Sequence, residues 1–151
     1  FREQLALASP PTAKALSHGR AVYQKTCGSC HRLYGVGGDL GPDITGSGRH
    51  DLGYLAENIL NPSGVVNRDW LLSVVELEDG RVLSGVVAES RERTVTLITP
   101  TEKLLLERDE IAAITPTSRS PMPEGLLEPL SAEEIRDLVA YLRHPVQVPL
   151  P

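Results

Sequence analysis

The sequence predicts a helical domain into which a small antiparallel β-sheet or half-barrel is inserted. Apolar side chains recur at steps of three and four in residues 13–25, 51–60 and 131–143, which is typical of helices that bury one face. Residues 70–115 instead alternate apolar and polar side chains and are rich in Val, Leu, Ile and Thr, which is typical of strands. A chain of 151 residues has room for one ordinary domain with such an insertion.

Capping residues mark the ends of the three expected helices. Thr12 is a suitable N-cap for the first helix, and Asn61-Pro62-Ser63-Gly64 stops the second. Ser131 caps the third helix, Glu134 completes a capping box with it, and Pro145 ends the helix.

Turn residues divide the alternating region into short strands. Asp79-Gly80 is a strong hairpin signal, and charged or Pro-containing connections separate the other runs. Five such strands in so short a stretch should curl into a small antiparallel sheet or half-barrel. The strands are expected at residues 71–77, 82–88, 95–99, 103–107 and 111–115.

The only two cysteines of the chain lie in Cys27-Gly28-Ser29-Cys30-His31. Two thiols three positions apart, followed at once by a histidine, form the arrangement that attaches haem through two thioethers, with the histidine as iron ligand. A disulfide would close a very small loop, a zinc site would need about two more ligands, and a thioredoxin-like pair would need a βαβ context. We therefore predict one covalently bound haem c, held by Cys27 and Cys30, with His31 on the iron.

A second iron ligand is expected from Met122, the only methionine, which lies between two prolines. Its thioether is a soft ligand that favours ferrous iron, and the prolines keep the segment extended. The alternatives are a methionine that merely fills a core gap and ligation by a second histidine. The competing histidines are His18, His50 and His144.

Other contacts to the cofactor are expected from residues between the motif and the strands. The backbone at Gly41–Pro42 can accept the second ring N–H of His31, which would orient the imidazole. Arg49 can reach a haem propionate, and Trp70 or Tyr54 can offer a second donor. The alternative for Gly41–Pro42 is an ordinary turn. Arg49 can instead be a surface arginine, and Trp70 a core tryptophan. The glycine-dense residues 33–48 suit a loop held closely against a flat group.

The chain resembles a class I cytochrome c in the order of its parts, which are a helix, the haem motif, Gly-Pro, a short helix, the Met loop and a terminal helix. This resemblance implies that Gly19 and Tyr23 pack the first helix across the last one, against Leu138 and Tyr141. The strands between the haem motif and Met122 depart from an ordinary class I domain.

With those strands, the chain resembles the haem-binding domain type common in Planctomycetes and Verrucomicrobia. The resemblance covers nearly everything from Gly19 to Arg143, and it implies a mainly α cytochrome c fold around one covalent haem, with the inserted sheet. In that family the domain is usually the C-terminal part of a larger secreted protein, after domains that resemble propeller-type sugar dehydrogenases and helical repeats. The motifs that carry the resemblance are residues 40–46, 58–62, 79–85 and 120–126.

These arguments divide the chain into parts. We expect residues 1–12 to be a linker or tail, residues 13–69 and 118–145 to form the cytochrome c domain, residues 70–117 to be the inserted β module, and residues 146–151 to be a tail.

The expected function is electron transfer rather than catalysis, because a haem with both axial positions filled has no open site for a substrate. The resemblance implies a dehydrogenase as electron donor, fused or separate, and another cytochrome or an oxidase as acceptor. The first alternative is a haem enzyme or gas sensor with a displaceable sixth ligand. The second makes the β insert a docking module for a partner or polymer, with a subsidiary haem.

Composition and the first four residues limit the classes of partner and the cellular location that we expect. The net charge is −5 without a basic run, which argues against nucleic acid, and no stretch approaches the roughly 18 apolar residues of a membrane span. Phe1-Arg2-Glu3-Gln4 lacks the features of a signal peptide. Haem attachment of this kind takes place outside a cytoplasmic membrane, so we expect a periplasmic or otherwise exported protein, either mature or cut from a longer chain.

Overall fold

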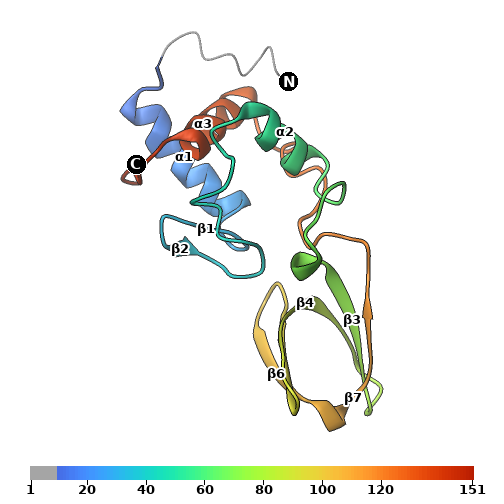
Figure 1. Cartoon of the computed structure of the whole chain (residues 1–151). Coiled ribbons are helices and arrows are strands. Elements are labelled where there is room, and N and C mark those ends of the chain that lie inside the picture. The colour runs from blue at the N-terminus through green and yellow to red at the C-terminus, as the bar shows by residue number, and fades with distance from the viewer. Residues whose placement is uncertain (1–9) are drawn as a thin grey trace.

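The computed structural model describes residues 10–151, so most of the expected linker or tail at 1–12 lies outside the described residues. Within 10–151 the α-helices are α1 (Ala13–Thr26), α2 (Leu52–Leu60) and α3 (Ala132–Arg143), each within a residue or so of its predicted bounds. The helices gather in one half of the molecule, and the five-stranded sheet lies in the other (Figure 1). The three N-caps act through side chains: Thr12, Asp51 and Ser131 each accept a backbone N–H of the first turn.

Helices α1 and α3 cross at a glycine. A Cβ atom at Gly19 would lie 2.0 Å from the carbonyl oxygen of Asp137, so only glycine allows this approach. Next to the crossing, the rings of Tyr23 and Tyr141 lie 5.6 Å apart, and Leu138 is fully buried. These contacts form the helical core, and they pair the residues that the resemblance implied.

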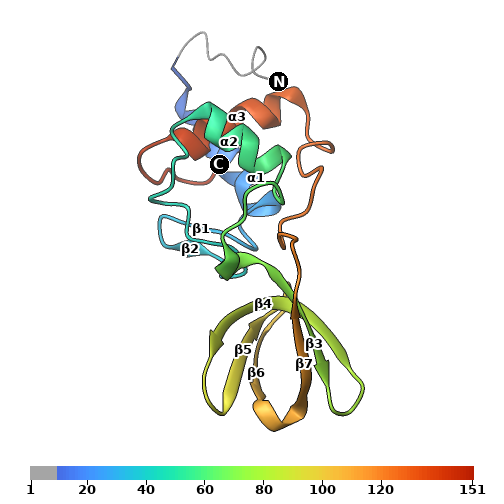
Figure 2. The same ribbon diagram turned by 45° about the vertical axis from the view of Figure 1, so that its right-hand side comes forward.

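The five-stranded sheet is antiparallel throughout and has the order β6-β5-β4-β3-β7. The short 3₁₀ helix η2 (Arg108–Glu110) joins the two edge strands β6 and β7, and the sheet curls strongly (Figure 2). Its own apolar core is centred on Val75 and Leu97, both fully buried. The strands are β3 (Leu72–Leu77), β4 (Val82–Ser90), β5 (Thr94–Ile98), β6 (Lys103–Glu107) and β7 (Ile111–Pro116).

A second, very small sheet lies inside the glycine-dense loop that follows the cysteine motif. Strands β1 (Arg32–Leu33) and β2 (Val36–Gly37) pair around a tight turn in which Tyr34 and Gly35 have φ values of 53° and 78°. The sequence predicts only a loop at residues 33–48, because two-residue strands carry no periodic signal.

The prediction of a mainly α cytochrome c fold is wrong. About 29% of the described residues are helical and about 25% are in strands, with only three α-helices among them and a five-stranded sheet. The physical reason is that the Gly-rich segment between α1 and α2 forms turns rather than further helix, and the segment between α2 and α3 holds the five strands. Helix and strand therefore contribute almost equally to this chain.

None of the helices in residues 10–151 combines the length and the apolar character that crossing a bilayer requires.

Candidate functional site

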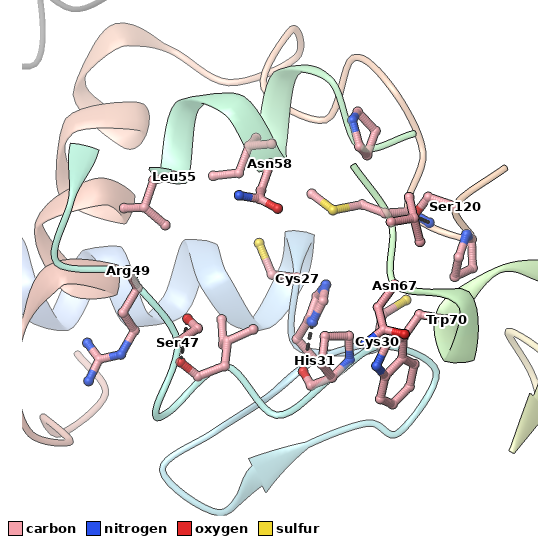
Figure 3. Close-up of a pocket in the computed structure, with 18 of the residues that line it drawn as sticks. Cys27, Cys30, His31, Ser47, Arg49, Leu55, Asn58, Asn67, Trp70 and Ser120 are labelled. Carbon is pink, nitrogen blue, oxygen red and sulfur yellow. Dashed lines mark hydrogen bonds between the residues drawn. The ribbon is translucent and has the colours of Figure 1, made fainter. Parts of the chain in front are cut away.

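A cavity of about 500 Å³ lies between the helical half and the two chain segments that join it to the sheet. The cavity is lined by Cys27, Cys30, His31 and Met122, although Met122 is far from the other three in the sequence. The walls are mostly apolar, and Figure 3 shows the labelled side chains around this space. The apolar lining residues include Leu40, Ile44, Leu55, Ile59, Val65, Val66 and Leu142.

The two cysteines are presented by a tight turn that continues α1. The backbone N–H of His31 donates to the carbonyl of Cys27 at 2.9 Å, and that of Cys30 donates to the same carbonyl at 3.1 Å. Both thiols are free and partly buried at the cavity. Burial raises the pKa of the Cys27 thiol to about 12, and the neighbouring Cys30 adds to the shift. Cys27 is therefore a neutral thiol at ordinary pH.

The imidazole of His31 is oriented by the loop that follows it. Its Nδ1 lies 3.0 Å from the carbonyl oxygen of Pro42, within the Gly41–Pro42 backbone that the sequence predicts as the acceptor. Because a carbonyl can only accept, Nδ1 carries the proton and Nε2 keeps a free lone pair for a metal. Gly41 packs on the ring so closely that a Cβ atom there would lie 2.6 Å from Cε1 of His31.

The backbone around His31 is also held from the helical side. The hydroxyl of Tyr23 donates to the carbonyl oxygen of His31 at 2.8 Å. Burial raises the pKa of Tyr23 well above its ordinary value, and the nearby Cys27 adds to this, so the phenol stays a neutral donor.

Met122 reaches the cavity from the segment that leaves the sheet. Its backbone N–H donates to Oγ of Ser120 at 3.1 Å, and its side chain is half-buried. Its place in the cavity lining is compatible with a thioether ligand to the same metal as His31, and the ligation itself stays a prediction.

Arg49 is buried, and most of its donors are already used. Its Nη1 donates to the carbonyls of Leu142 at 2.6 Å and His144 at 2.5 Å, and Nε donates to Thr45 at 3.1 Å. The guanidinium also lies over the ring of Tyr34, 5.0 Å from its centroid. Arg49 therefore ties the loop to the end of α3, and only Nη2 is left to meet a propionate.

Trp70 and Tyr54 both line the cavity, as a donor to the cofactor would have to. Trp70 is half-buried in the short 3₁₀ helix η1 (Arg68–Trp70), and Tyr54 is 43% exposed in the first turn of α2. Their contact with a cofactor remains a prediction.

The three other histidines are engaged elsewhere and are not among the cavity-lining residues. Nδ1 of His18 lies 2.7 Å from the Asp137 carboxylate. His50 and His144 place Nδ1 at 3.0 Å and 2.7 Å from backbone carbonyl oxygens.

Sequence reasoning missed part of the cavity wall. The segment 62–67 contributes Pro62, Val65, Val66 and Asn67, and Ser120 and Pro121 flank Met122 on the same wall. The one available signal was Val65-Val66, an apolar pair in a turn-rich stretch without its own secondary structure.

The residues present fit a covalently attached haem. Two thiols and an imidazole with a free Nε2 face one cavity, whose volume lies within the range of about 300–1,000 Å³ typical of cofactor sites. The walls are largely apolar, as the face of a porphyrin requires, and Gly41 leaves the imidazole ring uncrowded.

Comparison with known proteins agrees with this donor set. Residues 14–68 match the family described as cytochrome c oxidase, cbb3-type, subunit III. The match includes α1, the cysteine motif and α2, and it supports a c-type cytochrome with covalent haem c and a haem-based role in electron transfer. No curated protein matches the chain.

Proposed function

We propose that this chain is a monohaem electron carrier in which Cys27 and Cys30 hold the haem and His31 and Met122 are the axial ligands. The observation that carries the proposal is the single cavity that these four side chains share. When bound, haem c supplies an iron that takes up and releases one electron. With both His31 and Met122 on the iron, no position would be left open for a substrate, and the site would only exchange electrons.

The chain's own residues would set the properties of such a site. Pro42 fixes the tautomer of His31 and makes the imidazole a stronger donor. The soft sulfur of Met122 favours the ferrous state, and the apolar walls disfavour the additional positive charge of the ferric state. The sulfur and the apolar walls would raise the reduction potential, whereas the stronger imidazole donor would lower it, because it stabilises ferric iron.

The proposed division of the chain follows from the same site. Residues 13–69 and 118–145 form the haem-binding part, residues 70–117 are an inserted module, and residues 146–151 are a tail.

The insert supports assignment to the haem-binding type common in Planctomycetes and Verrucomicrobia. A dehydrogenase, fused or separate, would be the donor, and a cytochrome or oxidase the acceptor. Since haem c is attached outside the cytoplasmic membrane, we place the protein in the periplasm or another exported location.

Spectroscopy of the haem-loaded chain tests the proposal. The pyridine haemochrome should report two thioether bonds, and replacing both cysteines by serine should leave no haem attached after denaturation. The ferric protein should show the weak long-wavelength band of methionine ligation, and Met122→Leu, which keeps the volume, should abolish it. A matched Leu126→Met substitution in the wild-type background should leave the band unchanged. A wild-type spectrum without the band, with rapid CO binding to the ferrous form, would instead indicate an open sensor or enzyme site.

A further inference from the structure

The segment that carries Met122 is attached to the sheet more closely than to the helices. Strand β7 pairs with β3 as far as Pro116, opposite Ser73. The chain then continues through Thr117 and Arg119 and reaches Met122 without entering another regular element. Met122 therefore lies only six residues beyond the end of a sheet ladder.

Hydrogen bonds extend this ladder toward the cavity. The N–H of Thr117 donates to the carbonyl of Leu72 at 2.8 Å, and the N–H of Leu72 donates to the carbonyl of Arg119 at 2.9 Å. Oγ of Thr117 donates to the same Leu72 carbonyl at 2.8 Å and accepts from the N–H of Arg119 at 3.1 Å. We call these three residues, Leu72, Thr117 and Arg119, the stem.

Between the stem and Met122, one serine makes the last contact. The N–H of Ser120 donates to Oγ of Ser63, in the turn after α2, at 3.3 Å. Its own hydroxyl accepts the N–H of Met122 at 3.1 Å. On the other side of Met122, the next buried residue is Leu127, which belongs to the helical core. Of the two sides, the upstream one holds the methionine more closely.

The two chain segments that continue from the stem toward the helices both contribute to the cavity wall. Asn67 and Trp70 precede β3, and Ser120 and Met122 follow β7. The sheet core and the helical core share no residue, so the sheet is joined to the site through these two segments. Folding of the sheet brings their ends together across an intervening stretch of more than 40 residues.

We propose that the inserted sheet is the positioning element for the axial methionine, and that Thr117 and Ser120 transmit its position to Met122. This inference rests on the proposed function, because it presumes that Met122 is an iron ligand. In this arrangement the stem holds the sulfur at the cavity, and loosening the stem lets the methionine leave more easily. Thr117 and Ser120 are positioning residues, since neither side chain is itself a ligand.

Competition with imidazole in the ferric, haem-loaded chain measures how firmly Met122 is held. Thr117→Val removes two hydrogen bonds of the stem, and Ser120→Ala removes the acceptor of the Met122 N–H. Each should increase the apparent affinity for imidazole about fivefold, in line with the loss of a typical hydrogen bond. On heating, each variant should also lose the long-wavelength methionine band at a lower temperature than it loses its secondary structure, which far-UV circular dichroism follows.

The matched control is Thr99→Val in the turn between β5 and β6. The Thr99 hydroxyl also donates to a backbone carbonyl and accepts a backbone N–H, at 3.0 Å and 3.1 Å. Thr99 lies outside the stem and does not line the cavity. Its variant should bind imidazole within twofold of wild type.

Two results would overturn the inference. One is imidazole affinity within twofold of wild type for both Thr117→Val and Ser120→Ala, and the other is an equal increase for Thr99→Val and Thr117→Val. If Thr117→Val does not fold, Ser120→Ala decides alone, because it leaves the ladder intact. A wild-type protein that lacks the methionine band overturns the proposed function, whereas a band that is insensitive to the stem overturns only this inference.

Discussion

Replacing Gly19 by alanine should destabilise the protein, because the substitution fills the closest contact between α1 and α3. The added Cβ would lie 2.0 Å and 2.5 Å from the carbonyl oxygen and carbon of Asp137. These are backbone atoms of a helix, so no side-chain rotation relieves the clash. Since real Cβ contacts essentially never fall below 3.0 Å, the two helices must separate by about 1 Å.

The expected cost follows from two opposing effects. Overpacking costs about 1–3 kcal/mol, and the rigid neighbour places this case at the upper end. Alanine recovers about 1 kcal/mol through its better helix propensity. The net loss in the free energy of unfolding is therefore about 2 kcal/mol, which lowers the melting temperature of a chain of this size by about 4–8 °C.

Urea unfolding of the haem-loaded protein, followed by far-UV circular dichroism, measures this loss. Gly46→Ala is the matched control, because a Cβ atom there meets nothing within 4 Å, and it should stay within about 0.5 kcal/mol of wild type. Equal stability of the two variants would refute the argument that the helix crossing requires glycine.

Three further substitutions test the loop, the buried arginine and the capping box. Gly41→Ala should displace the imidazole of His31, because its Cβ would lie 2.6 Å from Cε1; a change in the haem spectrum at unchanged helix content checks this. Arg49→Met should cost about 3 kcal/mol in urea unfolding, since three hydrogen bonds to backbone carbonyls are lost at a 2% exposed site. Hydrogen bonds from the N-cap serine hold the pKa of Glu134 below its ordinary value of 4.5. The ionised carboxylate therefore stabilises the fold above that value, and the contribution is lost as the pH falls through the lower folded pKa. Glu134→Gln should flatten the decline of melting temperature below pH 4.5, and Glu133→Gln should not.

Local signals predicted the elements of this fold well. The capping residues and the apolar steps of three and four placed all three helices, and Asp79-Gly80 with the alternating pattern placed the five long strands. The balance between helix and strand was wrong, because the expectation of a mainly α fold came from a family resemblance. Hydrophobic periodicity predicts the secondary structure of each segment separately, and it does not predict that the connecting loops stay irregular.

The site was predictable only where its residues lie close together in the sequence. The contact between His31 and Pro42 spans 11 residues and follows from the loop that joins them. The role of Arg49 depends on the carbonyls at the end of α3, more than 90 residues away. Those carbonyls lack helical partners, as the last carbonyls of any helix do, but no sequence pattern shows that Arg49 reaches them.

The separation of the two apolar cores determines how the sheet can influence the site. Val75 and Leu97 are fully buried among residues of the sheet, and the helical core around Leu138 and Tyr141 includes none of them. A change in the sheet core therefore cannot alter the packing of α1 against α3 by direct contact. It can reach the cavity along the strands β3 and β7, whose extensions carry Trp70 on one side and Met122 on the other, and through β4, which packs against η1. The helices thus hold the cysteines and His31, while the sheet acts on the part of the wall that carries Trp70 and Met122.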